Sequence, residues 1–151
     1  MQIIKNREVV HTRWLPEPDL AQPDALDGRI LPLEAWLEQA KHFRLSERMD
    51  ELPGVLLEPD DGPEPLERWI PAIPVIAINA ENFADGRIYS LAFELRQFYH
   101  YEGEIRALGA IYDNLSMMEQ CGFDAFVLKQ GLSPEEAIPY FTEIGFDYSL
   151  R

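Results

Sequence analysis

The sequence predicts an α/β protein with a mainly parallel sheet of about four strands and helices between the strands. Short apolar runs alternate with amphipathic segments of helical period over residues 54–128, a pattern typical of strands connected by helical crossovers. The run at 73–79 (IPVIAIN) is apolar at both odd and even positions, as in a strand covered on both faces. Periodicity does not choose between a Rossmann-like sheet and a partial-barrel-like one.

Four strands are expected, at 54–57, 73–79, 104–108 and 125–128. Helices are expected at 88–101 and 111–120, with a brief one at 66–70. Gly122 is suited to end the second of these in a left-handed conformation. A last helix should begin at Ser133-Pro134-Glu135-Glu136, which supplies a capping hydroxyl, a first-turn proline and two acids.

The N-terminal third predicts a separate β-hairpin and one helix. Two apolar pairs, Ile3-Ile4 and Val9-Val10, flank the polar turn 5–7. Residues 15–27 read as a proline-rich loop, and 30–40 as a helix with Pro32 in its first turn. On length the chain is a single domain, 1–151, made of the hairpin and helix (1–50), the strand–helix core (54–128) and a C-terminal helix and tail (133–151).

The charge of the chain limits the partners it can have. There are 27 acidic and 13 basic residues, a formal net charge of -14. Such a field repels phosphate backbones and anionic lipids, so neither nucleic acid nor a membrane is an expected partner. The acidic residues predict a solubilising surface, and the alternative is that they dock onto a basic protein partner. No apolar run approaches the roughly 20 residues of a spanning helix, and MQIIKNREVV lacks the apolar core of a secretory signal. We therefore expect a cytoplasmic protein.

The sequence predicts no cofactor and no metal. GxGxxG and GxxxxGK[ST] are both absent, and the three histidines stand far apart without metal-binding spacing. The single cysteine, Cys121, excludes an internal disulfide and a CxxC pair. Because it lies at the negative end of a predicted helix, its thiol pKa should be raised, which favours a buried structural cysteine over a nucleophile.

The segment NFADGRIYSLAFELR (82–96) contains the best candidate site, where a strand leads into a helix. Ligands of parallel sheets lie beyond the carboxyl ends of the strands, and a helix that begins near residue 88 would offer free backbone N–H groups to an anion. Gly86 would supply a positive φ or a close approach to the ligand. The candidate anion-binding residues of this turn are Asp85, Gly86, Arg87, Tyr89 and Ser90.

Arg106 completes the candidate site, because an arginine in a central strand needs an exposed face or a partner such as Asp85, Asp124 or a ligand. We expect Arg87 and Arg106 to face one shared space that holds a carboxylate, sulfite or phosphate. In the structural alternative, Asp85 caps the helix and Arg87 pairs with Asp85 or Glu81 on the surface.

Three strings, FADGRIYSLAFELR, GEIRALG and CGFDAFVL, resemble the bacterial domain-of-unknown-function 934 family. The family pattern runs roughly F-x-DGR-x-YS-x-A-x-x-LR, then G-E-L-R-A-x-G-D, then R-x-GFDAF. Two departures stand out: Ala110 replaces an acid, and residues 118–120 replace a typically basic stretch. The matching positions are Phe83, Asp85, Gly86, Arg87, Tyr89, Ser90, Ala92, Leu95, Arg96, Gly103, Glu104, Arg106, Ala107, Gly109, Gly122, Phe123, Asp124, Ala125 and Phe126.

The resemblance implies a role in sulfite reduction, since members of this family are commonly described as oxidoreductases of that process because they accompany assimilatory sulfite reductase. The leading hypothesis is an accessory protein that binds sulfite reductase or its electron donor, with a small oxyanion as a further ligand. The first alternative is a small enzyme, an oxidoreductase for example, with its site at Asp85–Ser90. The second is a structural domain that forms a homodimer and has no ligand site.

Overall fold

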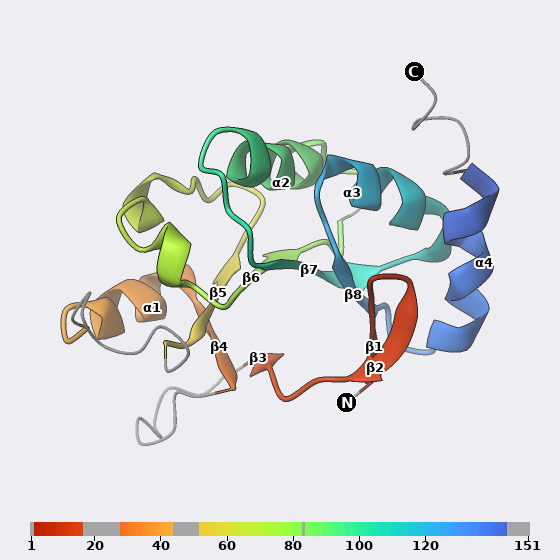
Figure 1. Cartoon of the computed structure of the whole chain (residues 1–151), viewed down its shortest axis with the longest axis horizontal. Coiled ribbons are helices and arrows are strands. Elements are labelled where there is room, and N and C mark those ends of the chain that lie inside the picture. The colour runs from red at the N-terminus through yellow and green to blue at the C-terminus, as the bar shows by residue number, and fades with distance from the viewer. Residues whose placement is uncertain (1, 17–27, 44–51, 83, 145–151) are drawn as a thin grey trace.

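The computed structural model describes residues 2–16, 28–43, 52–82 and 84–144. Within these residues, eight strands form one sheet in the order β2-β1-β8-β7-β6-β5-β4-β3 (Figure 1). Neighbours from β3 to β8 are parallel, and β1 is antiparallel to both β2 and β8. The strands are β1 (Gln2–Lys5), β2 (Glu8–His11), β3 (Leu15–Pro16), β4 (Arg29–Pro32), β5 (Gly54–Leu57), β6 (Val75–Asn79), β7 (Glu104–Ala110) and β8 (Ala125–Leu128).

The four α-helices of the described part of the chain lie along the outside of the sheet (Figure 1). Their buried residues join the helix-facing side chains of the strands in the larger apolar core, which includes Trp36, Ile76, Ile105 and Phe126. The helices are α1 (Leu33–Ala40), α2 (Arg87–Gln97), α3 (Leu115–Cys121) and α4 (Pro134–Ile144), and the 3₁₀ helices are η2 (Glu64–Leu66), η3 (Ile70–Ala72) and η4 (Tyr112–Asn114).

The predicted parallel core is confirmed, because β5 to β8 lie at the four expected segments and run parallel, although β6 begins only at Val75 and β7 extends to Ala110. The number of strands was wrong: the sheet has eight. Residues 29–32 form strand β4, and the helix begins only at Leu33. Pro32 is extended, with φ -55° and ψ 152°, and it occupies the N-cap position, outside the first turn. The two apolar residues Ile30 and Leu31 are too few to show the periodicity of a strand, so the sequence prediction included them in the helix that follows.

The predicted N-terminal hairpin is also confirmed, with Ile3 opposite Val10. It is not separate from the core, since β1 extends the sheet by pairing with β8. Residues 15–16, expected in a loop, form the edge strand β3, while 17–27 lie outside the described residues. The helix expected at 88–101 ends at Gln97, and the one expected at 111–120 divides into η4 and α3. In place of the brief helix expected at 66–70, the structure has the 3₁₀ helices η2 and η3.

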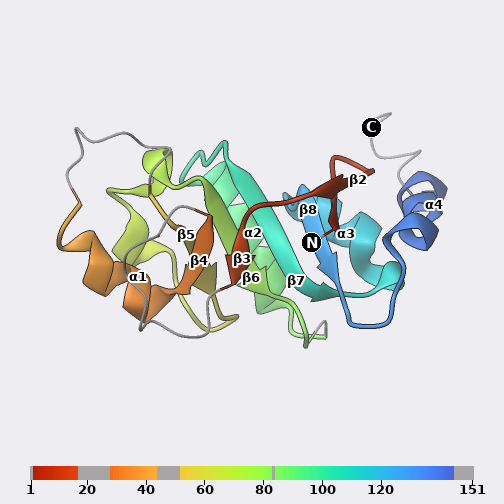
Figure 2. The same ribbon diagram turned by 90° about the horizontal axis from the view of Figure 1, so that it is seen from below.

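The order of the strands makes the sheet partial-barrel-like. Strands β3 to β8 are neighbours in chain order, without the reversal that defines a Rossmann sheet. Strands β2 and β3 lie at opposite edges, yet only residues 12–14 connect them. A flat sheet of this size would be about 34 Å wide, whereas this connection spans at most about 14 Å. The sheet therefore curls until its edges approach each other, as Figures 1 and 2 show.

The inner face of the curled sheet has its own side chains. A second apolar cluster, centred on Ile30, Val75 and Ala77, includes Trp14 from the connection between the edges. On β7 the residues alternate, so that Ile105 and Ala107 join the outer core. Arg106, paired in register with Ala77 of β6, belongs to the inner face. The segment 12–14, called the strap below, therefore covers Arg106.

Candidate functional site

The turn at Asp85–Arg87 is held by an ion pair within the turn. Arg87 donates from its backbone N–H and from Nε to Asp85 Oδ1, each at 3.0 Å, and from Nη2 to Oδ2 at 2.6 Å. The guanidinium of Arg87, through these bonds, lowers the pKa of the Asp85 carboxyl below its ordinary value. The pairing of Asp85 with Arg87 is the one predicted in the structural alternative. The N-cap position of α2 is occupied by Gly86, which forms no side-chain cap, and Asp85, one residue earlier, accepts the N–H of the first helical residue.

Gly86 does not have the backbone conformation expected of it. Its φ is -62°, which any residue adopts, and a Cβ built at this position would meet nothing within 4 Å. The glycine therefore provides neither a left-handed turn nor a close backbone approach in this structure. Gly122, by contrast, ends α3 with φ +126°, as predicted from its place in the sequence.

The hydroxyl groups of Tyr89 and Ser90 form hydrogen bonds within the protein. Tyr89 Oη accepts a hydrogen bond of 2.8 Å from Asn114 Nδ2, which connects α2 to the turn before α3. Ser90 Oγ donates to the carbonyl of Gly86 at 3.4 Å, one turn back along the helix. Both hydroxyls thus take part in contacts within the protein.

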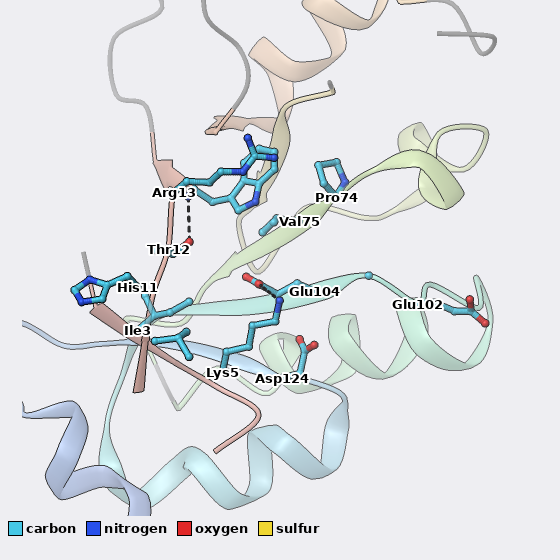
Figure 3. A pocket seen from close by; sticks show the side chains of 13 residues that line it. Ile3, Lys5, His11, Thr12, Arg13, Pro74, Val75, Glu102, Glu104 and Asp124 are labelled. Carbon is cyan, nitrogen blue, oxygen red and sulfur yellow. Dashed lines mark hydrogen bonds and ion pairs between the residues drawn. The ribbon is translucent and has the colours of Figure 1, made fainter. Parts of the chain in front are cut away.

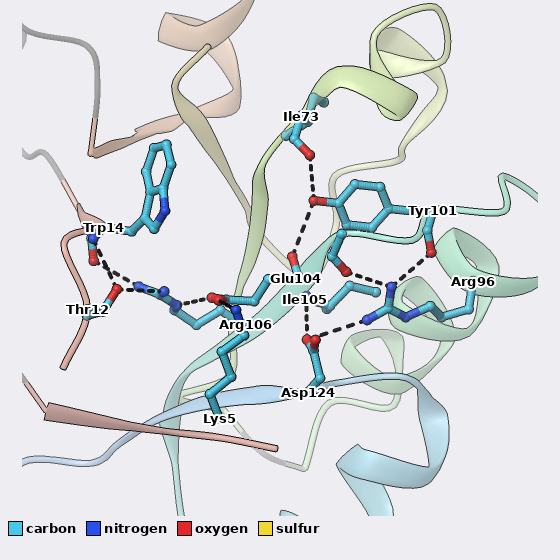
Figure 4. Close-up of polar contacts among 11 residues, drawn as sticks. Lys5, Thr12, Trp14, Ile73, Arg96, Tyr101, Glu104, Ile105, Arg106 and Asp124 are labelled. Atoms are coloured by element: carbon cyan, nitrogen blue, oxygen red, sulfur yellow. Dashed lines mark hydrogen bonds and ion pairs between the residues drawn. The ribbon is translucent and has the colours of Figure 1, made fainter. Parts of the chain in front are cut away.

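Arg106 is bound on three sides by the protein itself (Figure 4). Its side chain is 1 % exposed; Nε donates to Glu104 Oε2 at 2.5 Å, Nη1 to the carbonyl of Trp14 at 2.8 Å and Nη2 to Thr12 Oγ1 at 2.9 Å. Lys5 pairs with the other carboxylate oxygen of Glu104 at 3.1 Å. The predicted partner of Arg106 was Asp85, Asp124 or a ligand, whereas its partners are Glu104 and the strap.

The structure does not bring Arg87 and Arg106 together. Arg87 is exposed at the start of α2, and Arg106 is buried on the inner face under the strap. A pocket of ≈ 210 Å³ borders Arg87, and among its lining residues are four acids, Asp60, Asp61, Glu64 and Glu94. Anion binding by Asp85, Gly86, Arg87, Tyr89, Ser90 and Arg106 stays a prediction, and the acids around Arg87 favour a cationic group in this pocket.

A polar pocket of ≈ 490 Å³ opens between the N-terminal hairpin, the strap and the first residues of β6 and β7 (Figure 3). Its walls include Lys5, Glu104 and Asp124. Within the described part of the chain, no buried side-chain nitrogen or oxygen lacks a hydrogen-bond partner. The pocket lies at the amino ends of parallel strands, where residues serve stability more often than ligand binding. We interpret it as the seam where the strap meets the sheet.

Arg96, which sequence reasoning did not select, connects the three strings that carry the family resemblance (Figure 4). It lies in the last turn of α2 and donates from Nε to Gly122 O at 3.0 Å and from Nη1 to the carbonyls of Tyr101 and Gly103 at 2.8 and 2.7 Å. Nη2 lies 3.4 Å from Asp124 Oδ1. The one sequence signal was its position in the first string, close to the end of a helix whose carbonyls need donors.

Asp124 receives this arginine and fixes the start of two strands. Its Oδ1 accepts the backbone N–H of Ile105 at 2.8 Å, and the N–H of Asp124 donates to the carbonyl of Ile105 at 3.1 Å. Burial raises the pKa of the Asp124 carboxyl above its ordinary value, although the Ile105 N–H and Arg96 act in the opposite direction. The motif residues Arg96 and Asp124 therefore join α2, β7 and β8 and leave no vacant site between them.

The outer face of α2 and α3 exposes large apolar side chains. Phe93 is 48 % exposed, Phe98 70 % and Met117 59 %. The helix ends at Gln97, and Phe98, at the C-cap, is exposed. Cys121 is half-buried beside the two phenylalanines, and burial raises the pKa of its thiol, the direction expected from the sequence.

The described residues contain no group of three or more His, Cys, Asp or Glu side chains that could hold a metal ion. None of the described helices is long and apolar enough to cross a membrane.

Comparison with known proteins assigns the chain to a family. No curated protein and no solved structure matches it. The model of one family, described as a bacterial protein of unknown function (DUF934), matches residues 54–150, from β5 through α4 and beyond. This match contains all three strings described above and covers more than half of the chain, so the protein belongs to the bacterial DUF934 family.

Proposed function

We propose that this protein is an accessory component of assimilatory sulfite reduction that acts in the bacterial cytoplasm by binding sulfite reductase or its electron donor. The sulfite-reduction part is supported by the resemblance of the three strings to a family that accompanies that enzyme. The observation that carries the binding part is the exposed apolar surface of α2 and α3, formed by Phe93, Phe98 and Met117. Such patches are typical of contact surfaces.

Several basic side chains are already paired with groups of the protein, which supports a binding role over a reaction that depends on an anion. Arg87 is paired with Asp85, and Lys5 and Arg106 share the carboxylate of Glu104. Arg96 donates to three carbonyls. With a net charge of -14, the protein attracts a basic partner at long range, and steering of this kind needs no catalytic pocket.

Binding to purified components tests the proposal. The protein is immobilised, and sulfite reductase and its electron donor from the same bacterium are passed over it in separate interferometry experiments. We expect saturable binding of one of them that weakens as salt is raised, because salt screens the attraction between charged surfaces. Hen lysozyme, a basic protein without a role in this process, is the control. Equal binding of lysozyme, or binding of neither component at low salt, would contradict the proposal.

The small-oxyanion part has a separate test. Sulfite, sulfate and phosphate are titrated calorimetrically into the parent protein and the Arg87→Ala variant. Binding at the turn predicts heat in the parent and a clear loss in the variant, since a charged hydrogen bond is worth about 1.5–3 kcal/mol in binding. Equal heats in the two proteins would remove the turn from the proposal.

A further inference from the structure

A groove of ≈ 390 Å³ lies between α2 and α3, and its lining includes Phe93, Phe98 and Cys121. The two phenyl rings meet edge to face, with centroids 6.4 Å apart. Met117 precedes Cys121 by one turn of α3 and so extends the same outer surface. The buried stripe of α2 is already complete with Ile88, Leu91, Ala92 and Leu95. The exposed rings therefore add little to the core and remain available for contact.

An acidic pocket adjoins this groove along α2. The groove and the pocket of ≈ 210 Å³ described above share two lining residues, Ser90 and Glu94. The pocket adds Asp60, Asp61 and Glu64, and its cation, Arg87, is paired with Asp85. Burial and the charges of Glu64, Glu67 and Glu94 raise the pKa of the nearby Tyr99 hydroxyl, which agrees with a negative potential on this side of the helix.

We propose that this pair of depressions is the docking surface for a partner protein that presents an apolar side chain next to a lysine or arginine. The apolar side chain enters the groove lined by Phe93 and Phe98, and the cation enters the acidic pocket beyond Glu94. Apolar anchors at the centre and charges at the rim are the usual division of roles in an interface. This inference rests on the proposed function, because it names the surface by which the accessory protein holds its partner.

Charge disfavours a second copy of the chain on this surface. Each copy carries a net charge of -14, and the acidic pocket of one would meet the acidic surroundings of the other. Like charges that face each other across an interface disfavour association. Charge complementarity therefore selects a basic partner, and self-association is an outcome that the experiment must exclude.

The experiment uses two matched pairs of variants and two probes. Phe98→Ser removes the outer ring of the groove, and Gln97→Ser, at an exposed neighbour outside both depressions, is its control. Glu94→Gln removes the charge shared by groove and pocket, and Glu38→Gln on α1 is its control. The probes are purified sulfite reductase and a short synthetic peptide of lysine and leucine, with peptides in which glutamate replaces lysine or serine replaces leucine.

We expect Phe98→Ser and Glu94→Gln each to weaken binding of both probes about tenfold or more, the scale of an interface hot spot, while the two controls bind like the parent. Both control peptides should bind much more weakly than the lysine–leucine peptide. Cys121, the single cysteine, reports directly on the groove. Bound partner should slow its alkylation by N-ethylmaleimide, measured at alkaline pH because the pKa of this thiol is raised.

The failures can be told apart. If sulfite reductase binds but the variants do not weaken it and Cys121 stays as reactive as before, the docking surface is wrong and the proposed function stands. If neither sulfite reductase nor its electron donor binds, the proposed function fails, and the peptides decide on the surface. If the lysine–leucine peptide does not bind, or binds the variants as tightly as the parent, the docking surface is wrong as well. Sedimentation that shows self-association lost in Phe98→Ser would also overturn the inference, because the occupant would be a second copy.

Discussion

Arg96 and Asp124 form an ion pair across the end of α2 and the start of β8, with Nη2 and Oδ1 3.4 Å apart. Around this pair, Arg96 holds the carbonyls of Tyr101, Gly103 and Gly122, and Asp124 holds the N–H of Ile105. Residues from three separate strings thus meet at one junction. The pair gives the arginine and the aspartate of these strings a structural role.

The first prediction concerns Arg96. Arg96→Ala leaves partly buried carbonyls without a donor, so we expect a loss of about 2–4 kcal/mol in the free energy of unfolding. Arg87→Ala, on the same helix, removes a side chain that is 63 % exposed and should leave stability nearly unchanged. Urea unfolding of both variants measures the difference. Equal stability of the two variants would mean that the junction does not hold the fold together.

The second prediction concerns Glu104 and Arg106 under the strap. Arg106→Met removes one of the two cations that pair with the buried Glu104 carboxylate. We therefore expect the free energy of unfolding to fall by about 3–5 kcal/mol. The double variant Glu104→Gln/Arg106→Met should recover part of that loss, because no uncompensated charge stays buried. A double-mutant cycle by urea unfolding gives the coupling. Losses that simply add would show that the pair is not coupled.

The third prediction is a pH dependence from Asp124. Burial raises the pKa of this carboxyl in the folded protein, so the folded state binds the proton more tightly than the unfolded state does. Its contribution to stability is therefore greatest below the unfolded pKa, about 3.9, and falls as pH rises from there through the folded pKa.

Asp124→Asn keeps an oxygen that can accept the Ile105 N–H but does not titrate. Across about pH 3 to 6, the free energy of unfolding of the parent should therefore fall relative to that of the variant. Urea unfolding at several pH values provides the curve, and all other carboxyls are common to both proteins. A difference that grows in favour of the parent as pH rises would show that attraction to Arg96 outweighs burial.

The fourth prediction contrasts two glycines. Gly86→Ala should stabilise the protein by about 0.4–1 kcal/mol, because its φ of -62° suits alanine and the added methyl group meets nothing. Gly122→Ala should destabilise it, since φ is +126° and the new Cβ would lie 2.7 Å from Arg96 Cγ. Thermal unfolding of the two variants tests both signs. A clear loss of stability in Gly86→Ala would restore a conformational role for that glycine.

The fifth prediction concerns cofactors. The proposed accessory role predicts that the purified protein shows no flavin or haem absorbance and no stoichiometric metal. Absorbance spectra of the native and denatured protein, with elemental analysis, provide the measurement. A yellow preparation that releases flavin on denaturation would favour the small-enzyme alternative.

The sequence by itself determined the elements whose signals are local. Strands β5 to β8 follow from apolar runs, and Gly122 and Ser133 mark helix ends through preferences of the adjacent backbone. Ser133 Oγ indeed accepts the N–H of Glu136, at 3.4 Å. The pair Asp85–Arg87, two residues apart, was among the alternatives that the sequence offered. In each case the interaction that decides the structure lies within a few residues, so periodicity and capping rules suffice.

The tertiary structure decided the contacts between distant segments. Arg106 meets Thr12 and Trp14 from more than 90 positions away, and only the curl of the sheet brings the strap over it. The pairing of β1 with β8, the acids around Arg87 and the exposure of Phe98 arise in the same way. A side chain's partner depends on which elements pack beside it, and chain closure sets that packing. Composition and residue spacing therefore do not predict these contacts.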